Sequence, residues 1–213
     1  MNMFSGTEWS VIMCSYLLGC CTAGYYWMRF RTGLDIRRLG SGNAGARNVG
    51  RSLGASGFAI TFVLDFLKGA LAVWVAKWME LSPEAVIASM VAVVVGHAWP
   101  IQLRLQGGKG ISTAFGAIIF YNSGLALVLI SIFIPLFLLI RIFTLSGMLA
   151  FALSPLAAFL CGFTNLQVAA ISFLSILVLI THRKNIREEV GRLIPQKASR
   201  DISSNKEDPD HER

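Results

Sequence analysis

The chain has 213 residues, of which 54% are apolar and only 15% are charged, and its mean hydropathy is +0.61. A soluble domain usually carries about 25% charged residues, so this composition excludes an ordinary soluble protein. The formal net charge is +7. Its basic residues gather in stretches between apolar segments, which is typical of a membrane protein with a positive side and does not indicate a nucleic-acid partner.

Apolar segments of membrane-spanning length recur along the chain. Residues 9–28 carry no charge, and about 20 such residues in a helix cross the roughly 30 Å hydrocarbon layer. No Lys or Arg precedes this segment, so the cationic start of a signal peptide is missing and a retained first span is predicted. Further apolar segments follow at 53–76, 85–101, 111–122, 124–140, 142–161 and 167–181.

The predicted fold is therefore an all-α integral membrane protein, a polytopic bundle of about seven transmembrane helices, with residues 1–193 forming one transmembrane domain. Residues 111–122 are too short to cross the bilayer without tilt or local thinning. Because residues 111–140 can be divided in another way, six or eight spans remain open. Residues 194–213 are polar and mixed in charge, which predicts a disordered tail.

The positive charges orient the bundle. All Lys and Arg residues except Lys68 and Lys77 fall on one side, in connections between spans or after the last span. The positive-inside rule then predicts that the N-terminus lies outside and the C-terminus lies in the cytoplasm. The expected location is the cell (inner) membrane, crossed several times.

Three unusual segments share the predicted cytoplasmic side. They are LGSGNAGARNVGR at 39–51, GHAWPIQLRLQGGKGIST at 96–113 and THRKNIREEVGRL at 181–193. Polar residues this dense beside the bilayer are costly unless they line a wet pocket. Their occurrence on one side predicts a single polar site that faces the cytoplasm.

The first segment fits the G-x-G-x-x-G fingerprint from Gly40 to Gly45. A dinucleotide loop follows a buried strand in a soluble βαβ unit, whereas this segment lies between membrane spans. Glycines nevertheless let backbone N–H groups converge on an anion, and Arg47 and Arg51 supply guanidinium groups suited to phosphate. An anion site is favoured, and a flexible basic loop beside anionic lipid headgroups remains the alternative.

The second segment contains QGGKG at 106–110. It is not a Walker A motif, because Leu103 and Gly110 stand where that motif needs Gly and Ser or Thr. The glycines free the backbone amides around Lys109, and Thr113 lies at the start of the next helix. This pattern is equally typical of a phosphate or oxyanion cradle and of a tight turn between spans.

Other polar residues have two possible roles. His97 stands alone at the end of a span, where a structural role is the more common one, whereas His182 is followed within one helical turn by Arg183 and Asn185. Asp65 and Lys68 are spaced i, i+3 within a span. Either they form a buried ion pair or Lys68 reaches the site.

Taken together and in this order, these segments resemble the bacterial acyl-phosphate:glycerol-3-phosphate acyltransferase family. Its motif SGN-x-G-x-TN-x-x-R is matched at 41–51, GH-x-x-P with GGKG-x-[AS]-T at 96–100 and 107–113, and HR-x-NI at 182–186. D-x-x-KG at 65–69 and a segment near R-Y-[VI]-S-L at 141–145 also resemble the family. The similarity covers roughly residues 9–193.

The chain departs from the family pattern at the rims of these motifs. Arg47 stands where the family usually has Thr, and Leu105 and Gln106 replace Phe-Lys before the glycines. After Ile186, the residues Arg187, Glu188 and Glu189 replace the expected x-R-L. These departures bear on substrate preference and efficiency more than on the type of reaction.

The resemblance implies an enzyme that transfers a fatty acyl group from acyl phosphate to the 1-hydroxyl of sn-glycerol 3-phosphate. The products are lysophosphatidic acid and inorganic phosphate, in the first committed step of phospholipid synthesis. The expected partners are these substrates, membrane lipid and a functional link to the enzyme that makes acyl phosphate, with no cofactor and no metal. The H-x-x-x-x-D motif of other acyltransferases is absent, since Gln102 follows His97 and Arg187 follows His182 at that spacing. No nucleophile triad can be assembled, which favours direct transfer without a covalent enzyme intermediate.

The same resemblance implies the roles of individual residues. Lys109 and the amides of 107–110 would bind phosphate and the developing oxyanion, Ser41, Arg51 and Asn185 would orient the acceptor, and His182 or a substrate phosphate oxygen would take the hydroxyl proton. The acyl chain would lie in a groove between spans, open to the bilayer. The predicted catalytic residues are Ser41, Lys109, His182 and Asn185. The predicted substrate- and phosphate-binding residues are Gly42, Asn43, Gly45, Asn48, Arg51, Lys68, His97, Gly107, Gly108, Gly110, Thr113, Arg141, Thr144 and Arg183.

Two alternatives stay open. A secondary transporter of a phosphorylated metabolite would also use basic loops and broken helices, but with pseudo-symmetric halves and polar groups at the midplane. Here the polar groups gather at the cytoplasmic ends, and Asp65 and Lys68 are the deep exceptions. A non-catalytic lipid-binding relative is the other alternative, and the altered third motif is its best support.

Overall fold

The computed structural model describes residues 4–193, with side chains described up to Arg183. One compact unit ends at His182, and a second begins at Arg183. The helix bundle and its packing belong to the first unit. The predicted tail at 194–213 lies outside the described residues.

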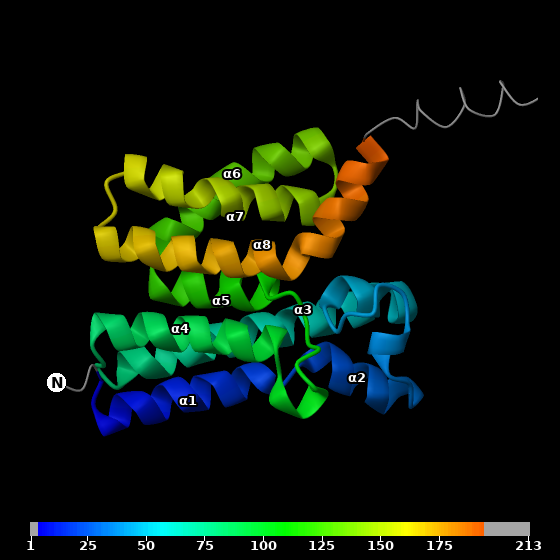
Figure 1. The fold of residues 1–213 in the computed structure, drawn as a ribbon, viewed down its shortest axis with the longest axis horizontal. Helices are drawn as coiled ribbons and strands as arrows, with labels where there is room; N and C mark the ends of the chain where they lie inside the picture. The colour runs from blue at the N-terminus through cyan, green and yellow to red at the C-terminus, as the bar shows by residue number, and fades with distance from the viewer. Residues whose placement is uncertain (1–3, 194–213) are drawn as a thin grey trace, which may run out of the picture. The chain divides into compact units, whose positions relative to one another are not determined.

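Every regular element between Gly6 and Leu193 is a helix (Figure 1). The α-helices are α1 Gly6–Cys20, α2 Ala23–Thr32, α3 Ala46–Trp78, α4 Pro83–Ala98, α5 Ile111–Tyr121, α6 Ser123–Ile140, α7 Phe143–Leu160 and α8 Asn165–Leu193, with short 3₁₀ helices η1 Ile36–Arg38 and η2 Ile101–Leu103. Among residues 4–193, six segments are long and apolar enough to cross a membrane, and α5 is shorter. The all-helical membrane fold predicted from the sequence is thus confirmed, including the short helix after the second polar segment.

Helix α5 is short and packs between longer helices. At 1.5 Å per residue its 11 residues extend about 16 Å, roughly half the hydrocarbon thickness. Ala114, Ala117 and Ile118 are at most 1% exposed, and Figure 1 shows α5 between the layer of α1, α3 and α4 and the layer of α6, α7 and α8. At its far end Asn122 separates α5 from α6, and its side chain accepts hydrogen bonds from the first amides of α6.

Two of the predicted spans are irregular. The first apolar segment is not one continuous helix, because α1 ends at Cys20 and α2 begins at Ala23. The helix α3 continues past Gly54, where φ is +72° and ψ is −165°, a conformation that glycine adopts without the penalty of a side chain. Both irregularities lie near the polar segments.

Glycines allow the helix backbones to approach closely where they cross. A Cβ added at Gly19 of α1 would lie 2.2 Å from the Val93 carbonyl oxygen of α4, and one at Gly96 of α4 would lie 2.1 Å from the Tyr16 oxygen of α1. The α3–α5 crossing is similar, because a Cβ at Gly69 would lie 2.0 Å from the Thr113 oxygen. Small residues at crossings are typical of membrane helices, which associate through close packing.

The crossing of α3 and α5 provides a test of this packing. We expect Gly69→Ala to lower the free energy of unfolding by about 1–3 kcal/mol, because the new methyl group displaces backbone that cannot yield cheaply. Reversible unfolding in mixed micelles would measure the change. Gly6→Ala is the matched control, since a Cβ there meets nothing within 4 Å. Equal stability of the two variants would contradict the proposed close packing.

Candidate active site

The three polar segments meet at one end of the bundle. The Ala44 amide of the first segment donates to the Gly107 oxygen of the second at 3.3 Å. The Thr181 hydroxyl of α8 donates to the Lys109 oxygen at 2.8 Å. The convergence predicted from the sequence is therefore present for the segments up to His182.

The first loop, residues 36–45, is organised by the side chain of Asn48. This amide is 3% exposed. Its Oδ1 accepts a hydrogen bond from the Ser41 amide at 3.0 Å, and its Nδ2 lies within hydrogen-bond distance of the carbonyl oxygens of Ile36, Leu39 and Asn43, at 3.3, 2.9 and 2.9 Å. The Asn48 side chain therefore shapes the loop. Its predicted part in binding substrate stays a prediction.

The other predicted site residues of the first loop lie around the Asn48 side chain. Ser41 and Gly42 are exposed, and Gly42 has a φ of +71° that favours glycine. The Asn43 side chain accepts from the Gly45 amide, and Gly45 is the N-cap residue of α3. Gly45 caps this helix without a side-chain hydrogen bond. The start of the helix and the exposed Arg51 in its second turn give the loop a positive character suited to an anion.

Arg37 fastens the first loop to the second, a role that the sequence did not predict. Its guanidinium donates to the Leu103 oxygen at 2.7 Å and pairs with Asp35 at 2.7 Å. This hydrogen bond holds the pKa of Asp35 below its usual value and raises the pKa of Arg37. The guanidinium also lies over the Tyr25 ring, 5.0 Å from its centroid. No signal marked this role of Arg37 in the sequence, because the Leu103 carbonyl group that it binds lies 66 residues away.

The second loop folds back onto the end of α4. The Gly107 and Gly108 amides donate to the oxygens of Ala98 and His97, at 3.1 and 3.0 Å. A Cβ at Gly107 would lie 2.1 Å from the His97 oxygen, so a side chain would displace the loop. Gly110 has a φ of +86° and is the N-cap residue of α5. The glycines in this motif are therefore required by the turn, which holds the half-buried Lys109 between α4 and α8.

Three buried ionisable residues, Asp65, Lys68 and His97, form a group next to this turn. Lys68 Nζ lies 2.9 Å from Asp65 Oδ1 and 2.8 Å from His97 Nδ1. It also donates to the carbonyl oxygens of Gly19 and Cys21 at 2.9 and 3.0 Å. The ion pair considered from the sequence is thus present, and the Lys68 ammonium is directed at the end of α1. His97 is the member of this group that contacts the glycine loop.

The third segment is helical, because α8 continues to Leu193. His182 is 2% exposed, and its Nδ1 lies 2.8 Å from the Val178 oxygen one turn earlier. Arg183 is exposed and belongs to the second unit, and the side chain of Asn185 lies outside the description. The assignment of Arg183 and Asn185 to the site remains a prediction.

The start of α7 contributes two further predicted residues. Arg141 is exposed and links α6 to α7 with a φ of +57°. Thr144 is buried and accepts a hydrogen bond from Arg47 of α3. The arginine that departs from the family pattern therefore joins the start of α3 to α7. Thr113, one turn into α5, is fully buried, and within the described part of the chain its Oγ1 has no hydrogen-bond partner.

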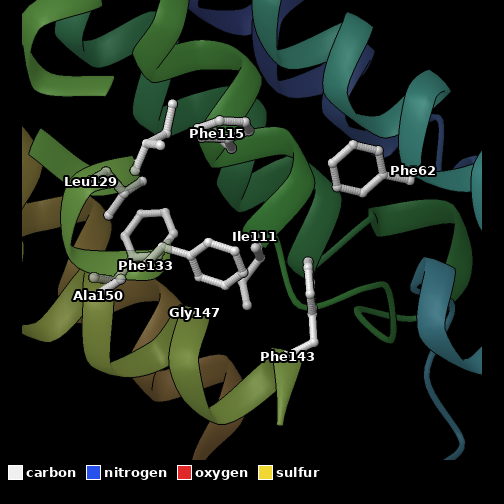
Figure 2. A pocket seen from close by; sticks show the side chains of 10 residues that line it. Phe62, Ile111, Phe115, Leu129, Phe133, Phe143, Gly147 and Ala150 are labelled. Atoms are coloured by element: carbon white, nitrogen blue, oxygen red, sulfur yellow. The ribbon is translucent and has the colours of Figure 1, made fainter. Parts of the chain in front are cut away.

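An apolar pocket of about 180 Å³ lies beside these loops (Figure 2). Figure 2 shows Ile111 near the centre of the lining side chains, and Ile111 directly follows Gly110 of the glycine loop. The lining comes from α3, α5, α6 and α7 and is entirely apolar: Phe62, Ile111, Phe115, Leu129, Ile130, Phe133, Phe143, Gly147, Ala150 and Phe151. Such a lining suits a hydrocarbon chain.

Comparison with known proteins identifies the family. A family model described as glycerol-3-phosphate acyltransferase matches residues 9–191. The chain belongs to the glycerol-3-phosphate acyltransferase family. Glycerol-3-phosphate acyltransferase 1 of Desulfitobacterium hafniense is 40% identical over 182 residues, which are 85% of this chain and 90% of that protein. Glycerol-3-phosphate acyltransferase 1 of Bacillus cereus is 35% identical, with coverage of 85% and 100%.

Solved structures agree with this assignment. The chain is similar to PlsY (YgiH), an integral membrane glycerol 3-phosphate acyltransferase, in its glycerol 3-phosphate form, with a TM-score of 0.80 and 30% identity over 87% of this chain and 93% of that one. The protein is thus an acyltransferase enzyme of the membrane, as the motifs predicted. The alternative of a transporter is set aside by this membership.

The dependence of the first loop on Asn48 can be tested in this acyltransferase. We expect Asn48→Ala to lower the free energy of unfolding by about 1–3 kcal/mol, because loop carbonyls lose their donor. Trypsin cleavage at Arg38, followed by mass spectrometry, should become markedly faster. Asn122→Ala is the matched control, since it removes the cap of α6 and leaves the loop unchanged. If both variants showed the same loop cleavage, Asn48 would not organise the loop.

Proposed function

We propose that this acyltransferase uses acyl phosphate as its donor and forms lysophosphatidic acid and inorganic phosphate. The observation that carries the proposal is the junction at Gly110 and Ile111. Gly110 completes the glycine–lysine loop, and Ile111 lines the apolar pocket. A ligand with a phosphate group next to a hydrocarbon chain fits both sides of this junction.

Two anionic groups take part in such a reaction, and the chain has two loops suited to them. The 107–110 loop offers the Lys109 ammonium and the amides at the start of α5, and we assign it to the leaving phosphate and the developing oxyanion. The first loop, with Ser41 and Arg51, is assigned to the phosphate of the acceptor. The family motif adds Asn185 to the acceptor group. The related PlsY structures were solved in glycerol 3-phosphate and lysophosphatidic acid forms.

The reaction then proceeds as a direct displacement. The 1-hydroxyl oxygen attacks the acyl carbonyl carbon, the bond from that carbon to the phosphate oxygen breaks, and phosphate leaves with the bonding electrons. The hydroxyl proton goes to His182 Nε2 or to a phosphate oxygen of the substrate. Catalysis rests on positioning and charge stabilisation. In the proposed topology the loops face the cytoplasm and the N-terminus lies outside, which connects the site to soluble glycerol 3-phosphate and to the source of acyl phosphate.

Lys109 is the decisive residue for this proposal. We expect Lys109→Ala to reduce turnover by roughly 10²–10³-fold, because the charge that stabilises the leaving phosphate is removed. Purified protein in lipid would receive palmitoyl phosphate and radiolabelled glycerol 3-phosphate, with palmitoyl-CoA replacing the donor in a parallel reaction. Phosphate release and lysophosphatidic acid would both be measured.

Lys77→Ala is the matched control, because Lys77 donates to the carbonyl oxygens of Phe120 and Tyr121 and lies outside the polar segments. Product from acyl phosphate alone is the expected result. Product from palmitoyl-CoA would overturn the assignment of the donor. The absence of product from both donors, in folded protein that binds glycerol 3-phosphate, would indicate a relative without activity.

The apolar pocket should determine the acyl-chain preference. Gly147 lines it, and a Cβ there would contact Ile111 Cδ1 at an ordinary 3.6 Å. We expect Gly147→Leu to fill the pocket and shift the preference toward shorter acyl phosphates, by about fourfold in kcat/KM for each methylene that no longer fits. Gly147→Ala serves as the control with little added volume. An unchanged preference in Gly147→Leu would place the acyl chain elsewhere.

A further inference from the structure

The buried group of Asp65, Lys68 and His97 lies next to the glycine loop. The contacts within this group determine which nitrogen of His97 carries the proton. Lys68 Nζ lies 2.8 Å from His97 Nδ1, so one of these nitrogens must accept the hydrogen bond. An ammonium nitrogen has no lone pair and can only donate, and Lys68 shares its three N–H groups among His97 Nδ1, Asp65 Oδ1 at 2.9 Å and the oxygens of Gly19 and Cys21 at 2.9 and 3.0 Å. Asp65 Oδ1 also lies 3.4 Å from His97 Nδ1, but the contact of Nδ1 with Lys68 is the shorter one. With the ammonium as the donor, His97 Nδ1 accepts and the imidazole proton resides on Nε2.

That protonated nitrogen faces the glycine loop. A Cβ added at Gly108 would lie 2.0 Å from His97 Nε2, and the Gly108 amide donates to the His97 oxygen at 3.0 Å. The His97 side chain thus occupies the space that any other residue at position 108 would need. Its N–H group lies beside the loop that carries Lys109.

The second buried histidine has the opposite arrangement. His182 Nδ1 lies 2.8 Å from the Val178 oxygen, and a carbonyl oxygen can only accept. Nδ1 of His182 therefore carries the proton, and Nε2 retains its lone pair. The Thr181 hydroxyl beside it donates to the Lys109 oxygen, so this end of α8 is attached to the same loop.

We propose that the buried Asp65–Lys68 pair acts through His97, holding the imidazole as the Nε2–H tautomer so that it donates to a phosphate oxygen bound by the 107–110 loop, while His182 is held in the opposite tautomer as an acceptor. Asp65 and Lys68 are positioning residues in this arrangement. The inference rests on the proposed function for the identity of the ligand as a phosphate group.

Nitrogen NMR of the full-length protein in lipid nanodiscs would test the tautomers directly. With ¹⁵N-labelled imidazoles assigned through single His→Gln variants, we expect a protonated Nε2 in His97 and a protonated Nδ1 in His182. Addition of inorganic phosphate should shift the His97 Nε2 signal. A protonated Nδ1 in His97, or an Nε2 signal that phosphate leaves unchanged, would overturn the proposal.

Variants connect the tautomer to turnover. The double variant Asp65→Asn with Lys68→Met removes both buried charges together, and we expect mixed tautomers at His97 and at least a tenfold fall in kcat with a smaller change in KM. His97→Gln keeps an N–H donor and should retain more activity than His97→Ala, which should lose roughly 100-fold. Ser89→Ala, at a buried position of the same helix, is the matched control.

These experiments can contradict the proposed donor and the proposed His97 tautomer independently of each other. If the protein used palmitoyl-CoA while His97 showed a protonated Nε2 that responds to phosphate, the proposed donor would be wrong and the tautomer assignment would stand. If acyl phosphate were used but the double variant kept its single tautomer and its kcat, Lys68 would have a structural role alone and the inference would be rejected.

Discussion

The ammonium of Lys68 is the constraint on which this end of the bundle depends. A cation inside a membrane protein is costly unless it is paired and hydrogen-bonded, and Lys68 is 6% exposed. Its partners are a carboxylate, an imidazole and two carbonyl oxygens. Those carbonyl groups belong to the point where α1 ends before α2 begins. The break in the first span and the buried charge therefore stabilise each other.

The same interaction sets the position of the glycine loop. Asp65 and Lys68 lie on α3, and the next residue, Gly69, is the point where α3 crosses α5. His97 lies at the end of α4 and contacts Gly108 with its side chain. The start of α5, which directly follows the glycine loop, is thus held in position by contacts from α3 and from α4. A short helix that packs against α3, α4 and α6 is suited to this role because its neighbours fix both its depth and its direction.

Much of this fold could be predicted from the sequence, because lipid requires continuous apolar helices with internally satisfied backbones. The predicted segments 111–122 and 124–140 agree closely with α5 and α6, although another division of residues 111–140 had remained open. In the structure Asn122 caps α6 and separates the two helices. The meeting of the polar segments was predicted because charge and chain direction place them on one side. These features depend on local composition and on periodicity.

The details of the site could not be predicted in the same way, because they depend on backbone carbonyl groups that only the folded chain brings near. The roles of Lys68, Arg37 and Asn48 are all of this kind. The family motif includes Asn48, but it does not show that the Asn48 amide hydrogen-bonds the loop. A sequence motif shows which residues occur together. A residue that shapes a loop and a residue that binds a ligand can both belong to such a motif.

If acyl phosphate is the donor, as proposed, the boundary between the polar loop and the apolar pocket accounts for a site at the helix ends. An acyl phosphate has its reactive carbonyl carbon between a dianionic group and a hydrocarbon chain, and these two parts are stable in opposite environments. At Gly110 and Ile111 the chain passes within one peptide bond from the glycine–lysine loop to a helix that lines an apolar cavity. A donor bound across this junction would present its carbonyl carbon at the boundary itself. The acceptor hydroxyl could then approach from the aqueous side without either substrate leaving its preferred solvent.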